Sequence, residues 1–231
     1  MAQISWPKIT GVIRIMSLIA GLSILALTAR GLFSAAPLRL PHGFHARALA
    51  LELVESTEDI KTIEAVYPAS VIRDELNLDL YIFIPFYLIL FLALGAWLSW
   101  SNIPYARLLG IAVAACVIVA ALWDVIEDLQ TFSVLRDLNQ TSVDSIRQAA
   151  LIKWTMLSVM MLLMAVPFVW RGGWVLMIGI LYGLTGVIGV LGVLWHHSLL
   201  EWYFALIGLA LLPTGKAIST LELHLRKHTQ G

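Results

Sequence analysis

The sequence predicts an all-α membrane protein, a polytopic bundle of about six transmembrane helices with short amphipathic helices in one loop. Hydrophobic residues make up 60% of the 231 residues and charged residues only 13%, and the mean hydropathy is +0.86. Soluble domains are only ~45–50% apolar. The apolar residues also gather in runs of ~20, the length that crosses the hydrocarbon core as a helix. We therefore treat residues 1–231 as a single transmembrane bundle domain.

Helices are expected because open strands would leave backbone groups without hydrogen bonds in lipid, and because the runs lack the alternation of a barrel strand. The first run could instead be a cleaved signal peptide, although its basic region is weak and Leu27 fits the cleavage pattern poorly. Pro85 should bend the second helix. Pro213 and Lys216 interrupt the sixth, but the aliphatic stem of Lys216 lets its ammonium reach the interface. The predicted spans are residues 11–32, 80–100, 105–124, 152–170, 174–194 and 201–218.

The one sizeable loop, residues 33–79, should hold short amphipathic helices that lie on the bundle or in the membrane interface. The segment HARALALELVES reads as one such helix. Ser56 followed by Asp59 is typical of a helix start, and STEDIKTIEAV continues with apolar residues at helical spacing. Residues 70–79 should wind into the second span. The pair Thr141 and Asp144 predicts the start of the fourth helix in the same way.

The charges exclude some classes of partner and indicate an orientation. Lys+Arg and Asp+Glu both number 15. The chain therefore has no net positive charge that would favour nucleic acid as a partner. The only cysteine, Cys116, excludes an intramolecular disulfide and a cysteine-based metal cluster. The expected partner is the lipid bilayer, while the ligand and the oligomeric state stay open.

With six crossings, the two termini and two short turns share one side, which carries a Lys/Arg excess typical of a cytoplasmic face. Both termini are therefore expected in the cytoplasm. The opposite, outer side then receives fourteen of the 15 acidic residues. The charged residues on the inner side are Lys8, Arg107, Arg171, Lys216, Arg226 and Lys227, against the single acid Glu222.

An acidic stripe closes the third span in the segment ALWDVIEDLQ. Asp124, Glu127 or Asp128, and Thr131 share one helix face. In one interpretation the helix simply emerges, and its acids are solvated or paired with Arg136, Lys153 or Arg147. In the other the acids face inward, where an ionisable group usually marks a functional site, because an Asp in mid-membrane costs ~2.5–3.5 kcal/mol.

The second interpretation predicts a polar site at the outer end of the bundle. Asp79 opens the second span and Lys153 lies in the first turns of the fourth, so both could approach the stripe. Asp124 and Glu127 are also the candidate catalytic pair, since two carboxylates in unlike environments can divide acid and base roles. The candidate ligand-binding residues are Asp79, Asp124, Glu127, Asp128 and Lys153.

A divalent metal is a further possibility, and no other cofactor is predicted. His196, His197 and Glu201 lie close together in LWHHSLLEWYF, and imidazole and carboxylate groups are ligands of zinc and similar ions. The spacing matches no closed metal-binding motif. Histidines beside Trp195 and Trp202 also fit residues at the membrane interface.

The glycines of YGLTGVIGVLG could be mistaken for a nucleotide-binding loop. Such a loop needs a strand before it and a helix after it, whereas this run lies inside an apolar span. Small residues in that setting let helices approach closely. We therefore expect Gly183, Gly186, Gly189 and Gly192, with Gly179 before them, to lie at helix contacts.

Four elements between residues 48 and 160 resemble a family of uncharacterised bacterial multi-pass membrane proteins. They are LELV in the loop, RDELNLDLYIFIPFY, WDVIED and Lys153. In that family an acidic D-x-x-E-[ND] motif closes a transmembrane helix, and here Asp128 stands where Asn is more usual. The resemblance implies a bacterial inner-membrane location and membership of a family, but no activity.

Three hypotheses about function follow from the sequence. The chain could bind or transport a small or lipid-like ligand at the polar site, or relay protons there. It could be a membrane-embedded lipid hydrolase, with a metal held by the histidines and acids. It could also be a structural or accessory subunit, in which polar groups only fix the helix register. Outward-pointing Asp124 and Glu127 with no cavity between the helices would favour this third hypothesis, whereas convergence of Asp79, Asp124, Glu127 and Lys153 within hydrogen-bond reach would favour a site.

Overall fold

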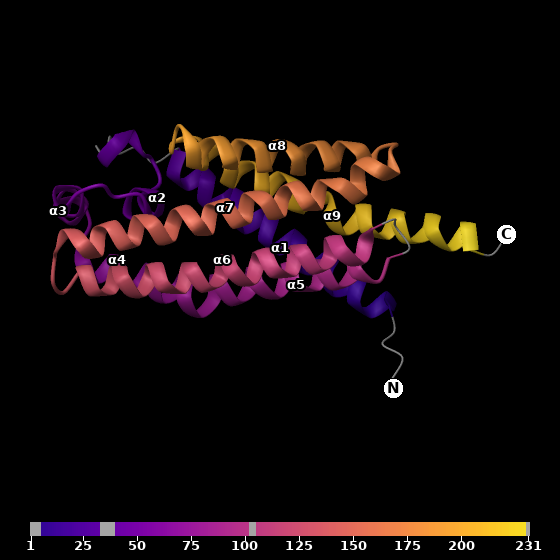
Figure 1. Ribbon diagram of the computed structural model, residues 1–231, viewed down its shortest axis with the longest axis horizontal. Helices are drawn as coiled ribbons and strands as arrows, with labels where there is room; N and C mark the ends of the chain where they lie inside the picture. Colours follow the sequence, from indigo (N-terminus) through magenta and orange to yellow (C-terminus); the bar gives the residue numbers. More distant parts are fainter. Residues whose placement is uncertain (1–5, 33–39, 102–104, 230–231) are drawn as a thin grey trace.

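The computed structural model describes residues 6–32, 40–101 and 105–229 (Figure 1). These residues form helices and connecting turns, with no strand among them. Six helices are long and apolar enough to cross a membrane, which confirms the predicted all-α polytopic bundle and an integral membrane protein. The spans are Thr10–Ala29, Ala69–Ser99, Ala106–Val134, Gln140–Arg171, Val175–Leu194 and Leu199–Glu222.

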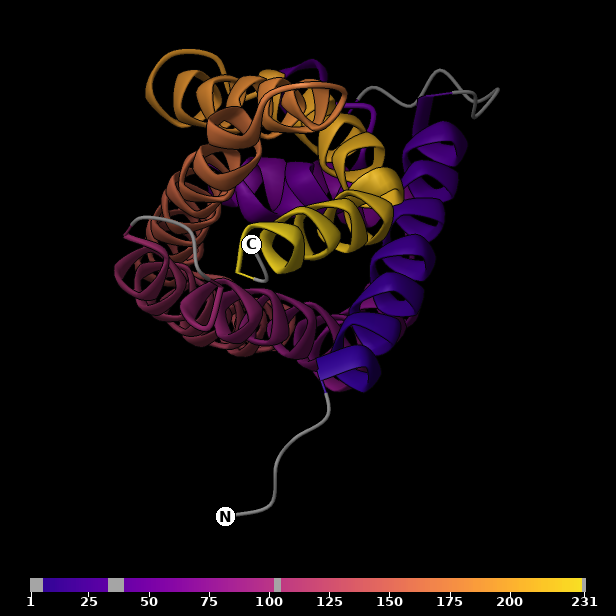
Figure 2. The same ribbon diagram turned by 90° about the vertical axis from the view of Figure 1, so that its right-hand side faces the viewer.

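The long helices form a closed ring that follows the order of the chain. α5 packs on α6, α6 on α7, α7 on α8 and α8 on α9, while α1 contacts both α9 and α5. Figure 2 shows this ring viewed along the bundle. The long helices are α1 (Trp6–Leu32), α5 (Ile84–Ser99), α6 (Ala106–Val134), α7 (Gln140–Arg171), α8 (Val175–Leu194) and α9 (Leu199–Thr229).

The short elements all lie at one end of the bundle, which we call the loop end (Figure 1). α1 begins and α9 ends at the opposite end, as an even number of crossings requires. The elements of the loop end are the 3₁₀ turn η1 (Pro41–Gly43), α2 (Arg47–Glu52), α3 (Thr57–Val66) and α4 (Ala69–Leu78).

α6 and α7 are longer than predicted and project past the other long helices, α1, α8 and α9, at the loop end (Figure 1). Their 29 and 32 residues span about 44 and 48 Å at 1.5 Å per residue, against a hydrocarbon core of ~30 Å. The sequence prediction ended the third span at residue 124 and began the fourth at 152, because hydropathy falls there. The predicted start of the fourth helix at Thr141 is also wrong, because Asn139 is the N-cap and accepts a 2.9 Å hydrogen bond from the Ser142 amide.

α3 begins at the predicted capping box. The Ser56 hydroxyl accepts from the Asp59 amide at 3.2 Å, and the Asp59 carboxylate accepts from the Ser56 and Glu55 amides at 3.0 and 2.9 Å. Partial burial opposes ionisation of Asp59, but these bonds and one with His42 outweigh it and lower the pKa of Asp59. The capping box thus fixes the start of α3 at the predicted residues.

α2 differs from the predicted amphipathic helix. It covers only Arg47–Glu52, and every residue from Leu49 to Val54 is buried, including Glu52. Six consecutive buried residues cannot form one face of an interfacial helix. The segment is therefore a plug that enters the loop end of the bundle, and it brings one carboxyl group with it.

The glycines of α8 lie at helix contacts, as predicted. A Cβ on Gly186 would lie 2.6 Å from Leu162 of α7, and one on Gly189 would lie 2.1 Å from the Ser158 hydroxyl. Gly183 is the exception, because its nearest neighbour, the Cβ of Ala165, would lie 3.8 Å away. Side chains at the tight positions would force α7 and α8 apart.

The sixth span continues as a helix through its interrupting residues. α9 runs from Leu199 to Thr229 with Pro213 inside it. The ammonium of Lys216 lies 5.7 Å from the centre of the Trp174 ring at the start of α8. The polar head of Lys216 therefore has an aromatic partner from a neighbouring helix.

Candidate functional site

Lys153 of α7 lies at the centre of a buried group of acids. Its Nζ lies 2.8 Å from Asp124 Oδ1, 2.8 Å from Glu127 Oε2 and 3.1 Å from Glu52 Oε2. The exposed fraction of these four side chains is 10% or less. We call Lys153, Glu52, Asp124 and Glu127 the acid–lysine cluster. It joins α2, α6 and α7 beneath the loop end.

The acids of α6 face inward because they share one side of the helix. Asp124, Glu127, Asp128 and Thr131 are all buried, at spacings of three, four and seven residues. The Thr131 hydroxyl donates a 2.9 Å hydrogen bond to the Glu127 carbonyl oxygen. A solvated helix face is therefore wrong for these residues, whereas the pairing with Lys153 that the same alternative allowed is present for Asp124 and Glu127.

Two aromatic side chains donate hydrogen bonds to acids of the acid–lysine cluster, while Glu127 Oε2 has, among the described residues, only the ion-pair contact with Lys153. The Tyr87 hydroxyl of α5 donates to Asp124 Oδ2 at 2.8 Å, and the Trp154 indole N–H donates to Glu52 Oε2 at 2.7 Å. Asp124 thus has a separate donor for each carboxylate oxygen, since Lys153 donates to its Oδ1. Charge-assisted bonds of this kind hold a buried carboxylate in one orientation.

The sequence analysis missed Glu52, Tyr87 and Trp154. It assigned Glu52 to the acidic outer side and did not single out either aromatic residue. A signal for Glu52 was present, since it is the only charged residue of the otherwise apolar stretch 48–54. No comparable pattern marks Tyr87, which reaches Asp124 only through the packing of α5 on α6.

Glu52 is the cluster acid that comes from outside the membrane-spanning helices. Its burial raises its pKa above the ordinary value, and the nearby charge of Asp124 adds to this effect. The ammonium of Lys153 and the hydrogen bond from Trp154 act in the opposite direction. The ammonium of Lys153 therefore favours the ionised form of Glu52, against the effect of burial on its pKa.

Asp79 and Asp128 lie beside the acid–lysine cluster but are not paired with Lys153. Asp128 is only 2% exposed. Its Oδ2 and the Oδ1 of Asp79 are buried atoms without a hydrogen-bond partner among the described residues. We call Asp79 and Asp128 the unpaired carboxyls.

A π-helical turn sets the position of Asp79. Residues Asp79–Phe83 (η2) join α4 to α5, and the Ile84 amide donates to the Asp79 carbonyl oxygen five residues earlier. Pro85 follows and has no amide hydrogen to continue the ordinary helical pattern. Pro85 is thus preceded by a π turn, which is wider than an α-helical turn. Such turns occur often at functional sites.

The two arginines near the site form ion pairs with acids outside the acid–lysine cluster. Arg147 forms an ion pair with Glu55, with Nη2 2.9 Å from Oε1, and Arg47 forms one with Glu75. In the described part of the chain, ion pairs therefore give the three acids of the cluster one base, Lys153, and the two unpaired carboxyls none. Isolated buried charges are costly, so the site needs protons or another cation to be neutral.

The residues proposed for a metal lie apart from this site and make other contacts. His197 Nδ1 is 2.9 Å from the Gly192 carbonyl oxygen, and His196 Nδ1 is 3.0 Å from the Ser198 hydroxyl. Glu201 accepts hydrogen bonds from the backbone amides of residues 45 and 46 at 2.5 and 2.8 Å. Within the described residues, no group of three or more His, Cys, Asp and Glu could hold a metal ion. The divalent metal stays a prediction.

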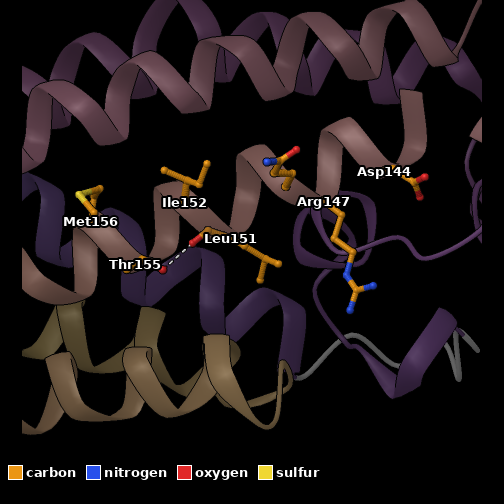
Figure 3. Close-up of a pocket in the computed structure, with 7 residues that line it drawn as sticks. Asp144, Arg147, Leu151, Ile152, Thr155 and Met156 are labelled. Carbon is orange, nitrogen blue, oxygen red and sulfur yellow. Dashed lines mark hydrogen bonds between the residues drawn. The ribbon is translucent and has the colours of Figure 1, made fainter. Parts of the chain in front are cut away.

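A surface groove of about 440 Å³ runs along α7, separate from the acid–lysine cluster (Figure 3). Its charged and amide side chains lie toward the start of α7, and apolar residues with Thr155 among them follow. None of its lining residues belongs to the cluster. They are Asp144, Arg147, Gln148, Leu151, Ile152, Thr155 and Met156.

The comparisons with known proteins found no relative of this chain. No protein-family model, no curated protein and no solved structure matches the chain. The resemblance carried by LELV, RDELNLDLYIFIPFY, WDVIED and Lys153 therefore stays a prediction, and the function has to be argued from the geometry of the site.

Proposed function

We propose that this integral membrane protein binds or transports a small or lipid-like ligand that carries positive charge, and that the ligand exchanges with protons at the acid–lysine cluster. The observation behind the proposal is the convergence of Glu52, Asp124 and Glu127 on the single ammonium of Lys153, with the two unpaired carboxyls beside them. Ionisable groups inside a helical bundle are costly, and they often mark ligand or proton routes.

The excess of acid over base selects the chemical class of the ligand. An anionic ligand would add to the negative charge around Asp124 and Glu127, whereas an amine or another small cation would offset it. Protons can do the same, so a cationic ligand and protons should compete for these carboxyl groups. We expect ligand binding to weaken as the pH falls, because protonation removes the charge that attracts the cation.

The orientation proposed with this function puts the loop end outside the cell and both termini in the cytoplasm of a bacterium, with the protein in its inner membrane. The argument is the Lys/Arg excess of the other end. A C-terminal reporter that is active only in the cytoplasm should be active when fused to the full chain. A reporter active only outside would reverse the orientation.

The test uses the full chain in proteoliposomes with a pH-sensitive dye inside. Adding a panel of small amines outside should drive proton movement, and Asp124→Asn or Glu127→Gln should slow it at least about tenfold, because each removes a carboxylate that contacts Lys153. Asp137→Asn, at an exposed acid of the α6–α7 connection, should leave the rate unchanged. Equal rates in all variants, or no response to any amine, would refute the proposal.

A second candidate function has one observation in its favour. The cluster ties α2, α6 and α7 together through Lys153, as a structural or accessory subunit would require. In that case the Asp124 and Glu127 variants would lower the unfolding midpoint, and the wild-type chain would move no protons or ligand.

A further inference from the structure

The groove along α7 has a charged end and an apolar length. Its lining residues recur at steps of three and four residues, so they form one face of the helix. Asp144 and Arg147 project from the stretch of α7 nearest the loop end, and Leu151, Ile152 and Met156 continue toward the middle of the helix (Figure 3). The groove therefore changes from charged to apolar along the direction in which α7 enters the membrane.

Exposed tryptophans at the other end of α7 set the depth of the groove in the membrane. Trp170 in α7 and Trp174 just before α8 are exposed, as aromatic residues at the membrane interface are. A hydrocarbon core of ~30 Å takes ~20 residues of helix at 1.5 Å per residue. Counted back from Trp170, that length ends at Ala150 of α7. Residues 151–156 then lie in the hydrocarbon, while Arg147 and Asp144 lie at the level of the lipid headgroups.

The start of α9 gives the same boundary from the loop end. α7 and α9 both begin at the loop end (Figure 1). The rings of Trp154 and Phe204 lie edge to face with their centres 5.0 Å apart, which puts these two residues at one depth. The exposed Trp202 lies two residues before Phe204, so it is level with Ile152. An interfacial tryptophan at this depth agrees with a boundary near Ala150.

The charged end of the groove offers a cation and an anion in a fixed order. Nη2 of Arg147 lies 2.9 Å from Glu55 Oε1, while 37% of the Arg147 side chain is exposed. A guanidinium has five N–H donors, so this one ion pair leaves donors for another oxyanion. Asp144 is exposed and lies one turn nearer the loop end. Its Oδ1 accepts a 2.9 Å hydrogen bond from the Gln140 side chain, which holds the carboxylate in place.

We propose that this groove binds a phospholipid whose headgroup carries a primary amine, as phosphatidylethanolamine does. The lipid phosphate accepts hydrogen bonds from Arg147, its ammonium donates to Asp144, and one acyl chain lies along residues 151–156. The order along α7, apolar then basic then acidic, matches the order along the lipid from acyl chain to phosphate to ammonium. Each charge of the lipid thus meets a charge of opposite sign.

The same arrangement discriminates against other common headgroups. The quaternary ammonium of a choline headgroup has no N–H to donate to Asp144. A glycerol headgroup has no positive charge, so Asp144 would face a lipid of net negative charge. The inference goes beyond the proposed function, because no residue of the groove belongs to the acid–lysine cluster.

The test uses the full chain in mixed detergent micelles with phosphatidylethanolamine that carries a photoreactive diazirine in one acyl chain. After illumination, the label should be concentrated in the peptide that contains residues 151–156. Unlabelled phosphatidylethanolamine should compete at least about tenfold better than phosphatidylcholine or phosphatidylglycerol, the effect of one hydrogen bond between charged groups. Soluble glycerophosphoethanolamine should not compete, because it has no acyl chain for the apolar part of the groove.

Two variants separate recognition of the headgroup from simple packing. Arg147→Gln should reduce labelling of residues 151–156 at least about tenfold, because the phosphate loses its charged donor. Arg136→Gln is the matched control, since Arg136 is an exposed arginine of the α6–α7 connection, and it should label like wild type. Asp144→Lys changes an exposed residue, so the chain should fold, and it should turn the preference toward phosphatidylglycerol. A groove that only packs an acyl chain would keep its preference in this variant.

Four outcomes would overturn the inference. One is a label spread evenly over the six spans, and another is equal competition by the three phospholipids. The third is an Asp144→Lys variant that still prefers phosphatidylethanolamine. The fourth is a chain that elutes as a dimer with no label on residues 151–156, because a second copy would then cover the groove. Competition by glycerophosphoethanolamine would likewise reject a lipid in favour of a free headgroup.

Discussion

Lys153 connects three helices through one ammonium group, and its energetic role differs from that of a surface lysine. Removing two opposite charges from water costs several kcal/mol per ion, so a buried ion pair adds little net stability by itself. Losing one partner is different, because the remaining charges stay buried without compensation. Around Lys153 three carboxyl groups would be left in that state.

We predict that Lys153→Met lowers the free energy of unfolding by about 3–5 kcal/mol at neutral pH, the cost typical of breaking a buried pair. Equilibrium unfolding in mixed detergent micelles measures the change. Lys61→Met is the matched control, because Lys61 pairs with Glu58 at 3.3 Å on the exposed face of α3 and should change stability by less than about 0.5 kcal/mol. Similar losses in the two variants would contradict a buried, charge-compensating Lys153.

At the scale of the helices, periodicity predicted α6 better than α2. The acids of α6 recur at helical spacing, so their common face followed from the sequence. The loop segment around Glu52 carries no comparable periodicity, since its neighbours are all apolar. Whether such a segment lies in the membrane interface or enters the bundle depends on the space that the long helices leave, and local sequence does not specify that space.

α7 and α8 offer a direct test of helix contact, because two glycines of one helix differ in their surroundings. We predict that Gly186→Ala costs about 1–3 kcal/mol through overpacking, since its Cβ would lie 2.8 Å from the Ser158 carbonyl oxygen as well as close to Leu162. Gly183→Ala should be neutral or slightly stabilising, because its Cβ meets only ordinary contact with Ala165. Unfolding midpoints of the two variants in one detergent measure the difference. Equal midpoints would mean that α7 and α8 are less closely packed at Gly186.

For the whole molecule, the ring of six helices is covered at one end by a segment that returns from the loop. Glu201 at the start of α9 accepts hydrogen bonds from two amides just before α2, those of His45 and Ala46. α2 then carries Glu52 to Lys153. The start of the sixth span and the centre of the acid–lysine cluster are thus joined through one short stretch of loop.

We predict that Glu201→Ala loosens this covering segment, because it removes an ionised acceptor from two backbone amides. Amide hydrogen exchange of residues 45–54 should become at least about tenfold faster, which corresponds to ~1.4 kcal/mol. Exchange in α3 should be unchanged in the control Glu64→Ala. If exchange of residues 45–54 is the same in Glu201→Ala and wild type, the segment is held by burial alone.

Hydropathy and periodicity were enough to predict the coarse structure and about half of the residues of the site. They predicted the six helices, the capping box of Ser56 and Asp59, and the shared face of Asp124 and Glu127, because each depends on residues within a few turns of one another. Lys153 could be predicted as a site residue because it is a charged residue inside an apolar run. These features are local, because each depends on interactions between residues that lie near one another along the chain.

The pairing of charges was decided only by the tertiary fold. Glu52 lies 101 residues from Lys153 along the chain, and nothing in the sequence states which acids share its ammonium or which oxygens lack a donor. That outcome depends on the depth to which α2 enters the ring and on the π turn that places Asp79. Hydrogen bonds and ion pairs are short-ranged and directional, so small differences in helix packing decide between a paired and an unpaired carboxyl group.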